Sequence, residues 1–429
     1  YGQWVRTQHQ ISRPKIVIGR DARISGLMIQ ELVMQTLVGM GIDVIDLGLS
    51  TTPTVEVMVP IEHAQGGIIL TASHNPKQWN ALKLLNDKGE FVNAEEGQAI
   101  LAFAEAASFE FATVDNLGVI TTREDAIKVH INEILKLPLV NKKAIASKNF
   151  KVVVDGVCST GGIAVPALLK DLGVEVVPLY CEPTGHFPHN PEPLEAHLTD
   201  LMAEVKRSGA HFGLVVDPDV DRLAFIDEHG AMFGEEYTLV AVADYVLSKT
   251  PGNTVSNLSS SRALRDITKT HACHYTASAV GEVNVVTAMK ATNSVIGGEG
   301  NGGIIYPALH YGRDSLVGVA LFLSFLAETE LTVSALRQKY PAYFMSKMKL
   351  NLEQGMDVDA LLNRVTEFYT NEEVTTVDGV KIDFAQSWVH LRKSNTEPII
   401  RVYTEADSQK EADKLASKFV EDLKQLAGL

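Results

Sequence analysis

The sequence predicts an α/β protein of three similar modules with mixed sheets, followed by a C-terminal α+β domain. Three times, a short apolar strand runs into a polar loop, then into a helix and a second strand. These openings begin at Lys15, Lys151 and Thr254. A chain of 429 residues with 45% hydrophobic content can build more than one core, and its length alone suggests about three domains.

Each opening has the same order of elements. Helical spacing of apolar residues at 27–38 predicts the helix of the first module. Because open α/β sheets bind ligands beyond the carboxyl ends of their strands, each polar loop is a candidate binding site. The predicted first strand, loop and second strand fall at 15–18, 19–23 and 41–48; at 151–154, 155–162 and 173–179; and at 254–258, 259–262 and 274–276.

Turn-forming and charged residues at 141–144 and 249–253 predict two domain boundaries, and the pattern changes after Pro341. We therefore expect domains at 1–142, 143–250, 251–342 and 343–429. The last domain should contain strands at 348–352, 389–391 and 399–403 and amphipathic helices at 358–369 and 410–426.

The composition excludes several classes of partner. A formal net charge of -15 argues against DNA or RNA, which require a basic stripe. Cys158, Cys181 and Cys273 give neither a disulfide framework nor a zinc spacing, and they fit a cytoplasmic location. The sequence has no run of about 18 apolar residues and no charged-then-apolar leader, so we expect no membrane span and no signal peptide.

Residues 66–76 carry the serine on which we expect the chemistry to depend. The apolar run from Ile68 to Leu70 leads onto a polar loop containing Ser73, and Pro76 fixes its exit. Such a serine is either a nucleophile for acyl or phosphoryl transfer, or a turn residue whose hydroxyl closes the loop. His74 is not automatically its base, because adjacent side chains point in different directions in an extended chain.

Asp217, Asp219 and Asp221 follow the apolar run 213–216 at alternate positions. Three carboxylates this close repel one another unless a cation lies between them. Mg²⁺ takes oxygen ligands and commonly shares its coordination sphere with a phosphate, so the triplet predicts a magnesium site. An acidic surface turn is the alternative, but the apolar strand 223–226 follows at once and argues against a solvated charge run.

Two further loops are candidates for substrate binding. Residues 392–401 combine two hydroxyl side chains, an asparagine and flanking arginines, which is typical of a phosphate cradle, although a plain hairpin loop is possible. Residues 296–303 are rich in glycine and carry Glu299 and Asn301 but no basic residue, which suits sugar hydroxyls better than phosphate.

In their order along the chain, these motifs resemble the α-D-phosphohexomutase superfamily, which includes phosphoglucomutase, phosphomannomutase and phosphoglucosamine mutase. The resemblance covers nearly the whole chain, and smaller signatures also match at 19–23, 276–281 and 312–316. The four principal motifs are T-A-S-H-N-P at 71–76, D-P-D-V-D-R at 217–222, G-E-G-N-G-G at 298–303 and R-K-S-N-T-E-P at 392–398.

The resemblance implies four domains around a central cleft, which in chain order carry the phosphoserine, the metal, the sugar and the substrate's other phosphate. By position, Ser73 carries the phosphoryl group and joins the three aspartates as a ligand of one Mg²⁺. Arg20, Lys83 and His74 complete the catalytic group. The implied substrate-binding residues are Arg222, Glu299, Asn301, Arg392, Ser394, Asn395, Thr396 and Arg401.

The chain departs from the family pattern at three places. It begins after the position of the family's N-terminal glycine- and arginine-rich strand, so we expect part of the first domain to precede Tyr1. The metal loop has Pro218 and Val220 where glycines are common. The sugar loop has Asn301 and Gly303 where the family often has serine and histidine.

The resemblance implies a mutase that moves phosphate between O6 and O1 of a hexose through phosphoserine and a hexose 1,6-bisphosphate. We expect a phosphoglucosamine mutase, with phosphomannomutase or phosphoglucomutase as the alternative. A Mg²⁺-dependent sugar phosphatase and a catalytically silent sugar-phosphate sensor are further alternatives. The expected partner is a small sugar phosphate, and the expected assembly is a monomer or a homodimer.

Overall fold

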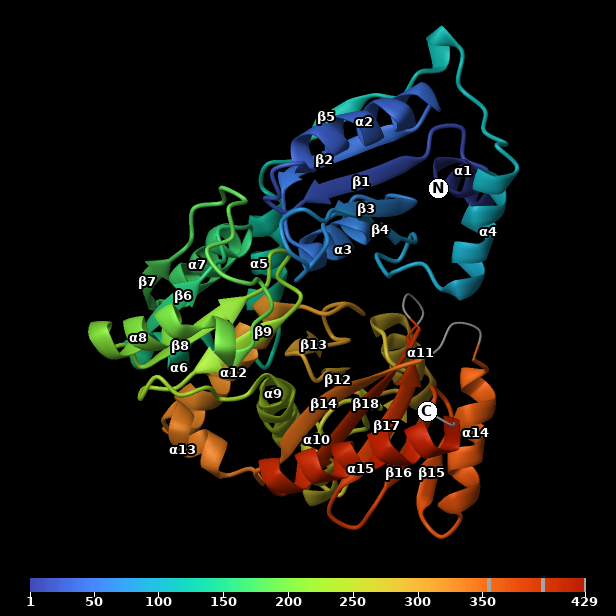
Figure 1. Ribbon diagram of the computed structural model, residues 1–429. Helices are drawn as coiled ribbons and strands as arrows, with labels where there is room; N and C mark the ends of the chain where they lie inside the picture. Colours follow the sequence, from blue (N-terminus) through green and yellow to red (C-terminus); the bar gives the residue numbers. More distant parts are fainter. Residues whose placement is uncertain (353–355, 395–397, 428–429) are drawn as a thin grey trace.

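The computed structural model describes residues 1–352, 356–394 and 398–427, and it confirms the predicted fold class (Figure 1). Three α/β modules are followed by a C-terminal domain with an antiparallel sheet. The first module comprises α1 (Gly2–His9), β1 (Lys15–Arg20), α2 (Gly26–Gly39), β2 (Asp43–Leu49), α3 (Thr52–Ile61), β3 (Gly66–Leu70), β4 (Leu82–Leu85), α4 (Ala94–Glu105), η1 (Val114–Asn116) and β5 (Ile120–Thr122).

The second and third modules follow along the chain. The second comprises α5 (Ala126–Lys136), α6 (Lys142–Ser147), β6 (Lys151–Asp155), α7 (Gly161–Asp171), β7 (Glu175–Leu179), η2 (Glu195–His197), α8 (Thr199–Ser208), β8 (Phe212–Val216) and β9 (Leu223–Ile226). The third comprises α9 (Glu235–Lys249), β10 (Thr254–Asn257), α10 (Ala263–Thr270), β11 (Tyr275–Ser278), α11 (Glu282–Thr292), β12 (Ile296–Glu299), β13 (Gly303–Ile305), α12 (Ser315–Thr329) and α13 (Val333–Gln338).

The three modules share one strand topology. Their sheets have the orders β4-β3-β1-β2-β5, β7-β6-β8-β9 and β11-β10-β12-β13. In each, the first strand pairs in parallel with the second and third, and a fourth strand pairs antiparallel with the third. Equivalent loops of the modules therefore lie at equivalent ends of their sheets.

The C-terminal domain has a different architecture and its own core. Its sheet has the order β14-β18-β17-β16-β15, and its pairs are antiparallel. Two helices with long apolar stripes pack on this sheet, as the amphipathic spacing predicts. Its elements are β14 (Phe344–Asn351), α14 (Val358–Phe368), β15 (Glu373–Thr375), β16 (Val380–Asp383), β17 (Trp388–Lys393), β18 (Ile399–Ala406) and α15 (Gln409–Ala427).

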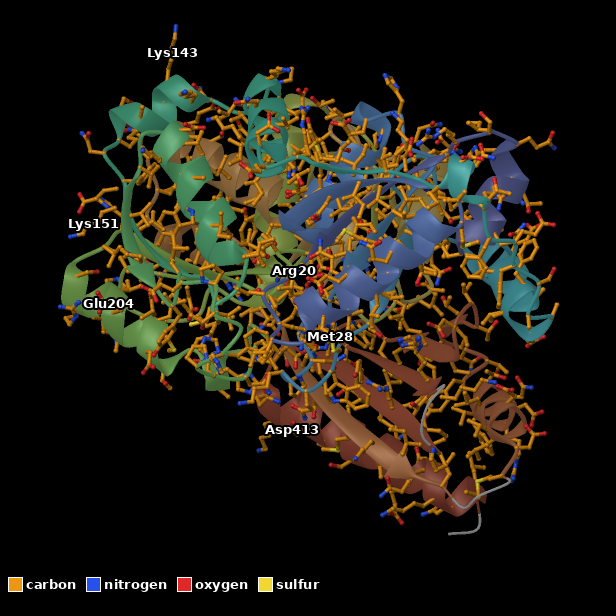
Figure 2. The ribbon with its side chains drawn as sticks, turned by 90° about the horizontal axis from the view of Figure 1, so that it is seen from above. Arg20, Met28, Lys143, Lys151, Glu204 and Asp413 are labelled. Carbon is orange, nitrogen blue, oxygen red and sulfur yellow. The ribbon has the colours of Figure 1, made fainter. Side chains whose placement is uncertain are left out.

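The second and third modules share one hydrophobic core, whereas the first module has separate clusters on the two faces of its sheet. At the centre of the shared core, the rings of Phe225 and Phe322 stack with centroids 3.8 Å apart. Seen from above, Arg20 lies near the middle of the view, where the first two modules meet, and Lys143 and Glu204 lie at the outer edge (Figure 2). The predicted catalytic region is thus at a junction between modules.

Candidate active site

The loop between β3 and β4 holds Ser73 in a constrained conformation. All five residues of β3 are buried, which fixes the start of the loop. Ser73 has φ 49°, a left-handed conformation that costs a non-glycine residue about 1–3 kcal/mol. Its backbone N–H donates to Thr71 Oγ1 at 2.9 Å, while its Oγ lies 2.8 Å from Asp217 Oδ2 and 3.3 Å from His74 Nδ1. The hydroxyl is therefore aimed at the second module.

Because Ser73 is not extended, the argument that adjacent serine and histidine side chains diverge does not apply to this loop. Burial, followed by the positive charge of Arg222, lowers the pKa of His74 to about 4. The ring is therefore neutral at pH 7, so one of its nitrogens can accept a hydrogen bond from a hydroxyl group.

Arg23 fixes the backbone of the serine loop, residues 71–81 between β3 and β4, through hydrogen bonds to its carbonyl groups. It is 1% exposed, and all five of its N–H groups are used. Its Nε donates to Asp21 Oδ2 at 2.9 Å, and Phe187 of the second module covers its guanidinium. Its two terminal nitrogens donate to four carbonyl oxygens of the loop, those of Ser73 (2.5 Å), Asn75 (2.8 Å), Pro76 (2.8 Å) and Trp79 (2.9 Å). Sequence reasoning missed this role, although Arg23 belongs to the G-R-D-A-R signature.

We expect Arg23→Lys to lower kcat about 100-fold with a smaller change in KM, because an ammonium group cannot hold four carbonyl groups in a fixed loop. Steady-state kinetics with a sugar 1-phosphate measures both constants. Arg337→Lys is the matched control, since Arg337 also donates to backbone carbonyls but lies against Tyr237 in the third module. Equal kcat losses in the two variants would show that Arg23 has only a structural role.

Three buried aspartates form the centre of the second module's loop between β8 and β9. Asp217, Asp219 and Asp221 are each 0% exposed, and one carboxylate oxygen of each lies within 4.8 Å of the others. Burial, followed by the charges of Asp221 and Asp219, raises the pKa of Asp217 well above its ordinary value. Among the described residues, Asp219 Oδ1 and Asp221 Oδ1 have no hydrogen-bond partner. Unpaired buried oxygens of this kind fit a divalent cation that prefers oxygen ligands.

Lys83 and Arg313 partly balance the three negative charges. Lys83 Nζ lies 2.7 Å from Asp219 and 2.9 Å from Asp221, and Arg313 Nη2 lies 2.8 Å from Asp221. Burial alone would lower the pKa of Lys83, but Asp219 and Asp221 outweigh it and the pKa is raised. Lys83 is therefore a cation beside the triad, at the position where a phosphoryl group would need charge neutralisation.

Arg313 also connects the aspartate triad to the glycine-rich loop of the third module. Its Nε donates to Glu282 at 2.8 Å, and its Nη1 lies 3.0 Å from Glu299. Glu299 accepts a second hydrogen bond, from Asn257 Nδ2 at 2.8 Å. Sequence reasoning did not assign a role to Arg313 or Glu282. The G-R-D-S-L signature at 312–316, which contains Arg313, was the one available indication of the first.

The motif loops that the sequence analysis singled out follow the third strand of each module, and the loops after the first strand, which it also named as candidate binding sites, contact them. The loops after the first strands form hydrogen bonds to the loops that follow the third strands. In the second module, Ser159 and Thr160 donate to the carbonyl of Pro218 at 2.6 and 2.9 Å. In the third, Ser260 Oγ accepts from the backbone N–H of Gly300 at 3.0 Å. In the first module, Arg23 of the loop after β1 likewise holds the loop after β3. In all three modules, the loop after the first strand therefore supports the loop after the third strand.

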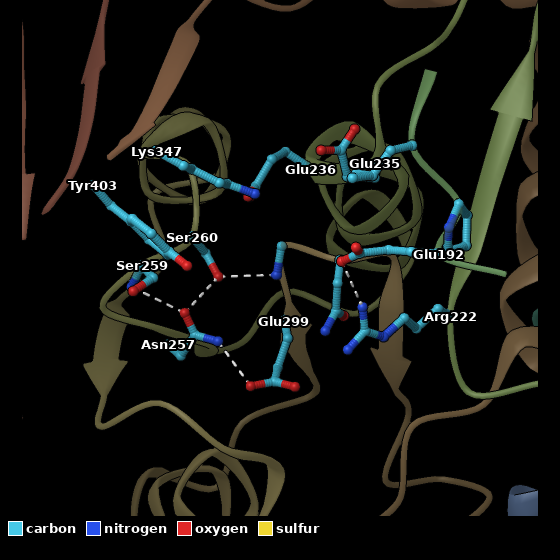
Figure 3. A pocket seen from close by; sticks show the side chains of 14 residues that line it. Glu192, Arg222, Glu235, Glu236, Asn257, Ser259, Ser260, Glu299, Lys347 and Tyr403 are labelled. Atoms are coloured by element: carbon cyan, nitrogen blue, oxygen red, sulfur yellow. Dashed lines mark hydrogen bonds and ion pairs between the residues drawn. The ribbon is translucent and has the colours of Figure 1, made fainter. Parts of the chain in front are cut away.

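A pocket lies between the second module, the third module and the C-terminal domain (Figure 3). Three of the predicted substrate-binding residues, Arg222, Glu299 and Asn301, line it. Arg222 Nη1 lies 3.3 Å from Glu192 Oε1, and Asn301 Oδ1 accepts from the backbone N–H of Gly303 at 3.1 Å. The remaining lining residues are Glu192, Pro193, Leu194, Glu235, Glu236, Asn257, Ser259, Ser260, Gly300, Lys347 and Tyr403.

The predicted phosphate loop of the C-terminal domain connects β17 to β18. Arg392 and Arg401 are opposite each other in the register of these strands, where like charges repel unless an anion lies between them. Arg392 Nε is 2.8 Å from Asp378, and Arg401 lies 3.4 Å from the hydroxyl of Tyr403, which lines the pocket. The backbone N–H of Ser394 donates to Ile399. Asn395 and Thr396 lie outside the described residues.

Arg20 occupies the carboxyl end of β1, beside the strand that leads to Ser73. Its register partner on β3 is Leu70. Its guanidinium donates to Gln30 Oε1 at 2.8 Å and to the carbonyl of Asp21 at 3.2 Å. Arg20 therefore lies at the correct sheet edge, but its hydrogen bonds to described residues stay within the first module.

A serine hydroxyl on a buried carboxylate triad, with cationic side chains beside it, defines an enzyme of phosphoryl transfer. Comparison with known proteins identifies the family. Three domain models of phosphoglucomutase/phosphomannomutase, named alpha/beta/alpha domains I, II and III, match residues 1–111, 128–230 and 234–343, and the C-terminal domain model matches 348–422. The chain belongs to the phosphoglucomutase/phosphomannomutase family, whose members interconvert sugar 1- and 6-phosphates.

Individual relatives agree with this assignment. A phosphoglucomutase/phosphomannomutase of Thermococcus kodakarensis is 37% identical over 93% of this chain and 88% of its own. A phosphoglucosamine/phosphogalactosamine mutase of Sulfurisphaera tokodaii is 30% identical over 94% of this chain and 90% of its own. The crystal structure of a phosphoglucomutase/phosphomannomutase family protein of Burkholderia thailandensis superposes with a TM-score of 0.85 at 25% identity, covering 99% and 91% of the two chains.

Proposed function

We propose that this chain is a Mg²⁺-dependent phosphoglucosamine mutase that carries the transferred phosphoryl group on Ser73. The observation that carries the proposal is the 2.8 Å contact between Ser73 Oγ and Asp217 Oδ2, which joins the nucleophile to the buried triad. Ser73, Asp217, Asp219 and Asp221 would hold the cation, which would stabilise the negative charge of the transferring group.

The proposed reaction has two half-reactions, which transfer the phosphoryl group first from Ser73 to the sugar and then from the sugar back to Ser73. In the first, a hydroxyl oxygen of the sugar phosphate attacks the phosphorus of phosphoserine, and Ser73 Oγ leaves. In the second, after the sugar has turned around, Ser73 Oγ attacks the phosphorus of the other phosphate of the hexose 1,6-bisphosphate, and the sugar oxygen of that phosphate leaves as a hydroxyl group. Each half-reaction moves one proton between the sugar hydroxyl and Ser73, and neutral His74, 3.3 Å from Ser73 Oγ, is the side chain we assign to carry it.

Lys83 and Arg313 supply positive charge in both half-reactions. Their ion pairs with the triad are already formed, so little reorganisation is needed when a phosphate dianion arrives. Arg222 would orient the sugar phosphate from the pocket wall. Arg392 and Arg401, with Ser394, Asn395 and Thr396, would hold the phosphate that does not react, and Arg20 would assist proton transfer near the phosphoserine.

The pocket's acidic wall supports an amino sugar as the substrate. Of its four glutamates, Glu192 pairs with Arg222, Glu299 pairs with Arg313, and Glu236 accepts the backbone N–H of Ser261 at 2.8 Å. Within the described part of the chain, the carboxylate of Glu235, at the start of α9, has no hydrogen bond or ion pair. A half-buried free carboxylate favours a protonated amine over a neutral hydroxyl at the same position.

We expect kcat/KM for glucosamine 1-phosphate to exceed those for glucose 1-phosphate and mannose 1-phosphate. Glu235→Gln should reduce the preference for the amino sugar about tenfold, or about 1.4 kcal/mol, because it removes the free charge and keeps the shape. Side-by-side kinetics of the three substrates tests this, with Glu367→Gln, an exposed glutamate of α14, as control. A neutral hexose as best substrate, or an unchanged ratio in Glu235→Gln, would refute it.

A glucose or mannose mutase is the second candidate, and the 37% identical relative named phosphoglucomutase/phosphomannomutase favours it. A solved N-acetylphosphoglucosamine mutase of Aspergillus fumigatus, described in complex with GlcNAc-6P and magnesium, shares this fold at 15% identity. A phosphatase would release inorganic phosphate instead of isomer and would not respond to hexose 1,6-bisphosphate.

We infer a small sugar phosphate as the partner and, from three free cysteines, a cytoplasmic location.

No helix in the described ranges has the length and apolar character that crossing a membrane requires.

A further inference from the structure

Asp378 lies in the turn between β15 and β16 and contacts Arg392, the first residue of the predicted phosphate loop. Arg392 Nε lies 2.8 Å from Asp378 Oδ2 and 3.0 Å from Asp378 Oδ1. Within the described part of the chain, the two terminal nitrogens of Arg392 have no hydrogen-bond partner. Because a guanidinium can bind an anion through two parallel N–H groups, Asp378 fixes Arg392 at Nε and leaves its terminal nitrogens available for a phosphate.

The same carboxylate also binds the backbone of the third module. The N–H of Val280 donates to Asp378 Oδ2 at 3.0 Å, and the next N–H, that of Gly281, donates to Glu299 Oε1 at 3.2 Å. Gly281 has φ 111°, which favours glycine, and it precedes α11, whose N-terminus attracts negative groups. Two successive N–H groups therefore hold one carboxylate of the C-terminal domain and the carboxylate of the glycine-rich loop.

The backbone of Asp378 is held by a second contact between these two domains. His390 Nε2, on β17, lies 2.6 Å from the carbonyl oxygen of Asp378, and His390 Nδ1 lies 2.9 Å from Ser259 Oγ. Burial lowers the pKa of His390 to about 4, so the ring is neutral at pH 7. Since a carbonyl oxygen only accepts, Nε2 carries the proton and Nδ1 accepts from Ser259. Ser259 lines the pocket together with Asn257 and Glu299 (Figure 3), so both contacts of Asp378 lead to one wall of that pocket.

Further contacts connect Glu299 to the aspartate triad. Glu299 Oε2 lies 3.0 Å from Arg313 Nη1, and Arg313 Nη2 lies 2.8 Å from Asp221 Oδ2. An unbroken series of ion pairs and hydrogen bonds therefore runs from Arg392 to the proposed metal site. A substrate that reacts at one end while its phosphate is bound at the other needs a fixed distance between these two places, because a small misplacement of the reacting group slows the reaction.

We propose that Asp378 is a positioning residue for the proposed mutase reaction, an inference that rests on Arg392 holding the substrate's non-reacting phosphate. Asp378 fixes the guanidinium of Arg392 at a set distance from the glycine-rich loop. Without Asp378, Arg392 keeps its charge but gains rotamers, and ordering it again costs free energy each time a substrate binds. Arg401, its register partner on β18, then repels it without an offsetting carboxylate. The contribution of Asp378 to catalysis therefore requires Arg392.

A double-mutant cycle with Arg392→Ala tests the proposal. We expect Asp378→Ala to lower kcat/KM for glucosamine 1-phosphate about tenfold in the otherwise wild-type protein, but less than about twofold in the Arg392→Ala variant. Calorimetry with glucosamine 6-phosphate, in a Ser73→Ala background that cannot turn over, should show a rise in Kd of about tenfold with the same dependence on Arg392. Asp359→Ala is the matched control, because Asp359 pairs at 2.7 Å with Lys393, the neighbour of Arg392, and its loss should change neither quantity.

Equal losses from Asp378→Ala with and without Arg392 would overturn the proposal, because they would show a role in domain packing that does not act through Arg392. Unchanged or tighter binding of glucosamine 6-phosphate by Asp378→Ala would also overturn it, and tighter binding would show that the carboxylate competes with the phosphate. If circular dichroism shows that Asp378→Ala does not fold, Asp378→Asn decides by the same cycle, since it keeps the side-chain volume and removes the charge. Absence of mutase turnover in the wild type would instead refute the proposed function, and the calorimetric cycle would still decide the role of Asp378.

Discussion

Replacing Ser73 by alanine is expected to abolish mutase activity, with a loss of at least about 10³-fold in kcat/KM, or about 4 kcal/mol in transition-state stabilisation. The reason is chemical, because Ser73 Oγ is the proposed atom that both accepts and releases the phosphoryl group. The fold should survive, since the loop is fixed by Arg23 through backbone carbonyls and not through the hydroxyl. Coupled-enzyme kinetics and circular dichroism measure the two effects.

Mass spectrometry makes the Ser73 prediction specific. Intact wild-type protein should contain a fraction with one added phosphoryl group, mapped to the peptide that carries Ser73, and Ser73→Ala should lack it. Ser208→Ala is a matched control, because Ser208 donates to the carbonyl of Glu204 at 2.8 Å on α8 and its hydroxyl bonds neither Ser73 nor the triad in the described part of the chain. A phosphoryl group on another residue, or full activity of Ser73→Ala, would exclude the proposed mechanism.

The second large effect is expected for Asp219→Asn. Asp219 has an unpaired Oδ1 and contacts Lys83 and Thr52 through Oδ2. The substitution keeps the volume but removes one ligand charge, so we expect kcat to fall about 10²–10³-fold, or about 2.7–4 kcal/mol. Mg²⁺ affinity should fall as well, which titration calorimetry measures independently of turnover.

Asp227→Asn is the control for this prediction. Asp227 lies just beyond β9, and its Oδ1 accepts the backbone N–H groups of His229 and Ala231, which an amide oxygen can also do. We expect that variant to keep its Mg²⁺ affinity and most of its kcat. If Asp219→Asn retains the wild-type Mg²⁺ affinity, or if EDTA leaves wild-type turnover unchanged, the triad does not hold the catalytic metal.

The site depends on a repeated topology more than on any single motif. In each module the reactive loop joins the third strand to the antiparallel fourth strand, and Lys83 lies on the fourth strand of the first module. The loop after the first strand then supplies the side chains that hold it. Three copies of one arrangement, facing a common junction, place the proposed nucleophile, the proposed metal ligands and the glycine-rich loop on separate rigid supports.

The sequence by itself determined the three strand-loop-helix-strand openings and the positions of the motif loops. Apolar runs such as 68–70 and 213–216 have the composition of buried strands, and they lie in β3 and β8. This information is local, because strand length, apolar spacing and turn residues act over a few neighbouring positions. The ordered motifs also identified the family, which the comparisons confirm.

Only the tertiary structure decided which side chains meet. Arg23 reaches carbonyls 50 to 56 residues away, and Arg313 joins Asp221 to Glu299, although neither pairing follows from periodicity or spacing. The direction of Ser73 depends on a left-handed backbone angle that its neighbours impose. His130 of α5 lies 3.0 Å from Asp314, and His310, in the loop before α12, lies 3.4 Å from Glu56 of α3, because elements distant in the sequence pack together. Such contacts arise from packing over long range, which residues adjacent in the sequence do not specify.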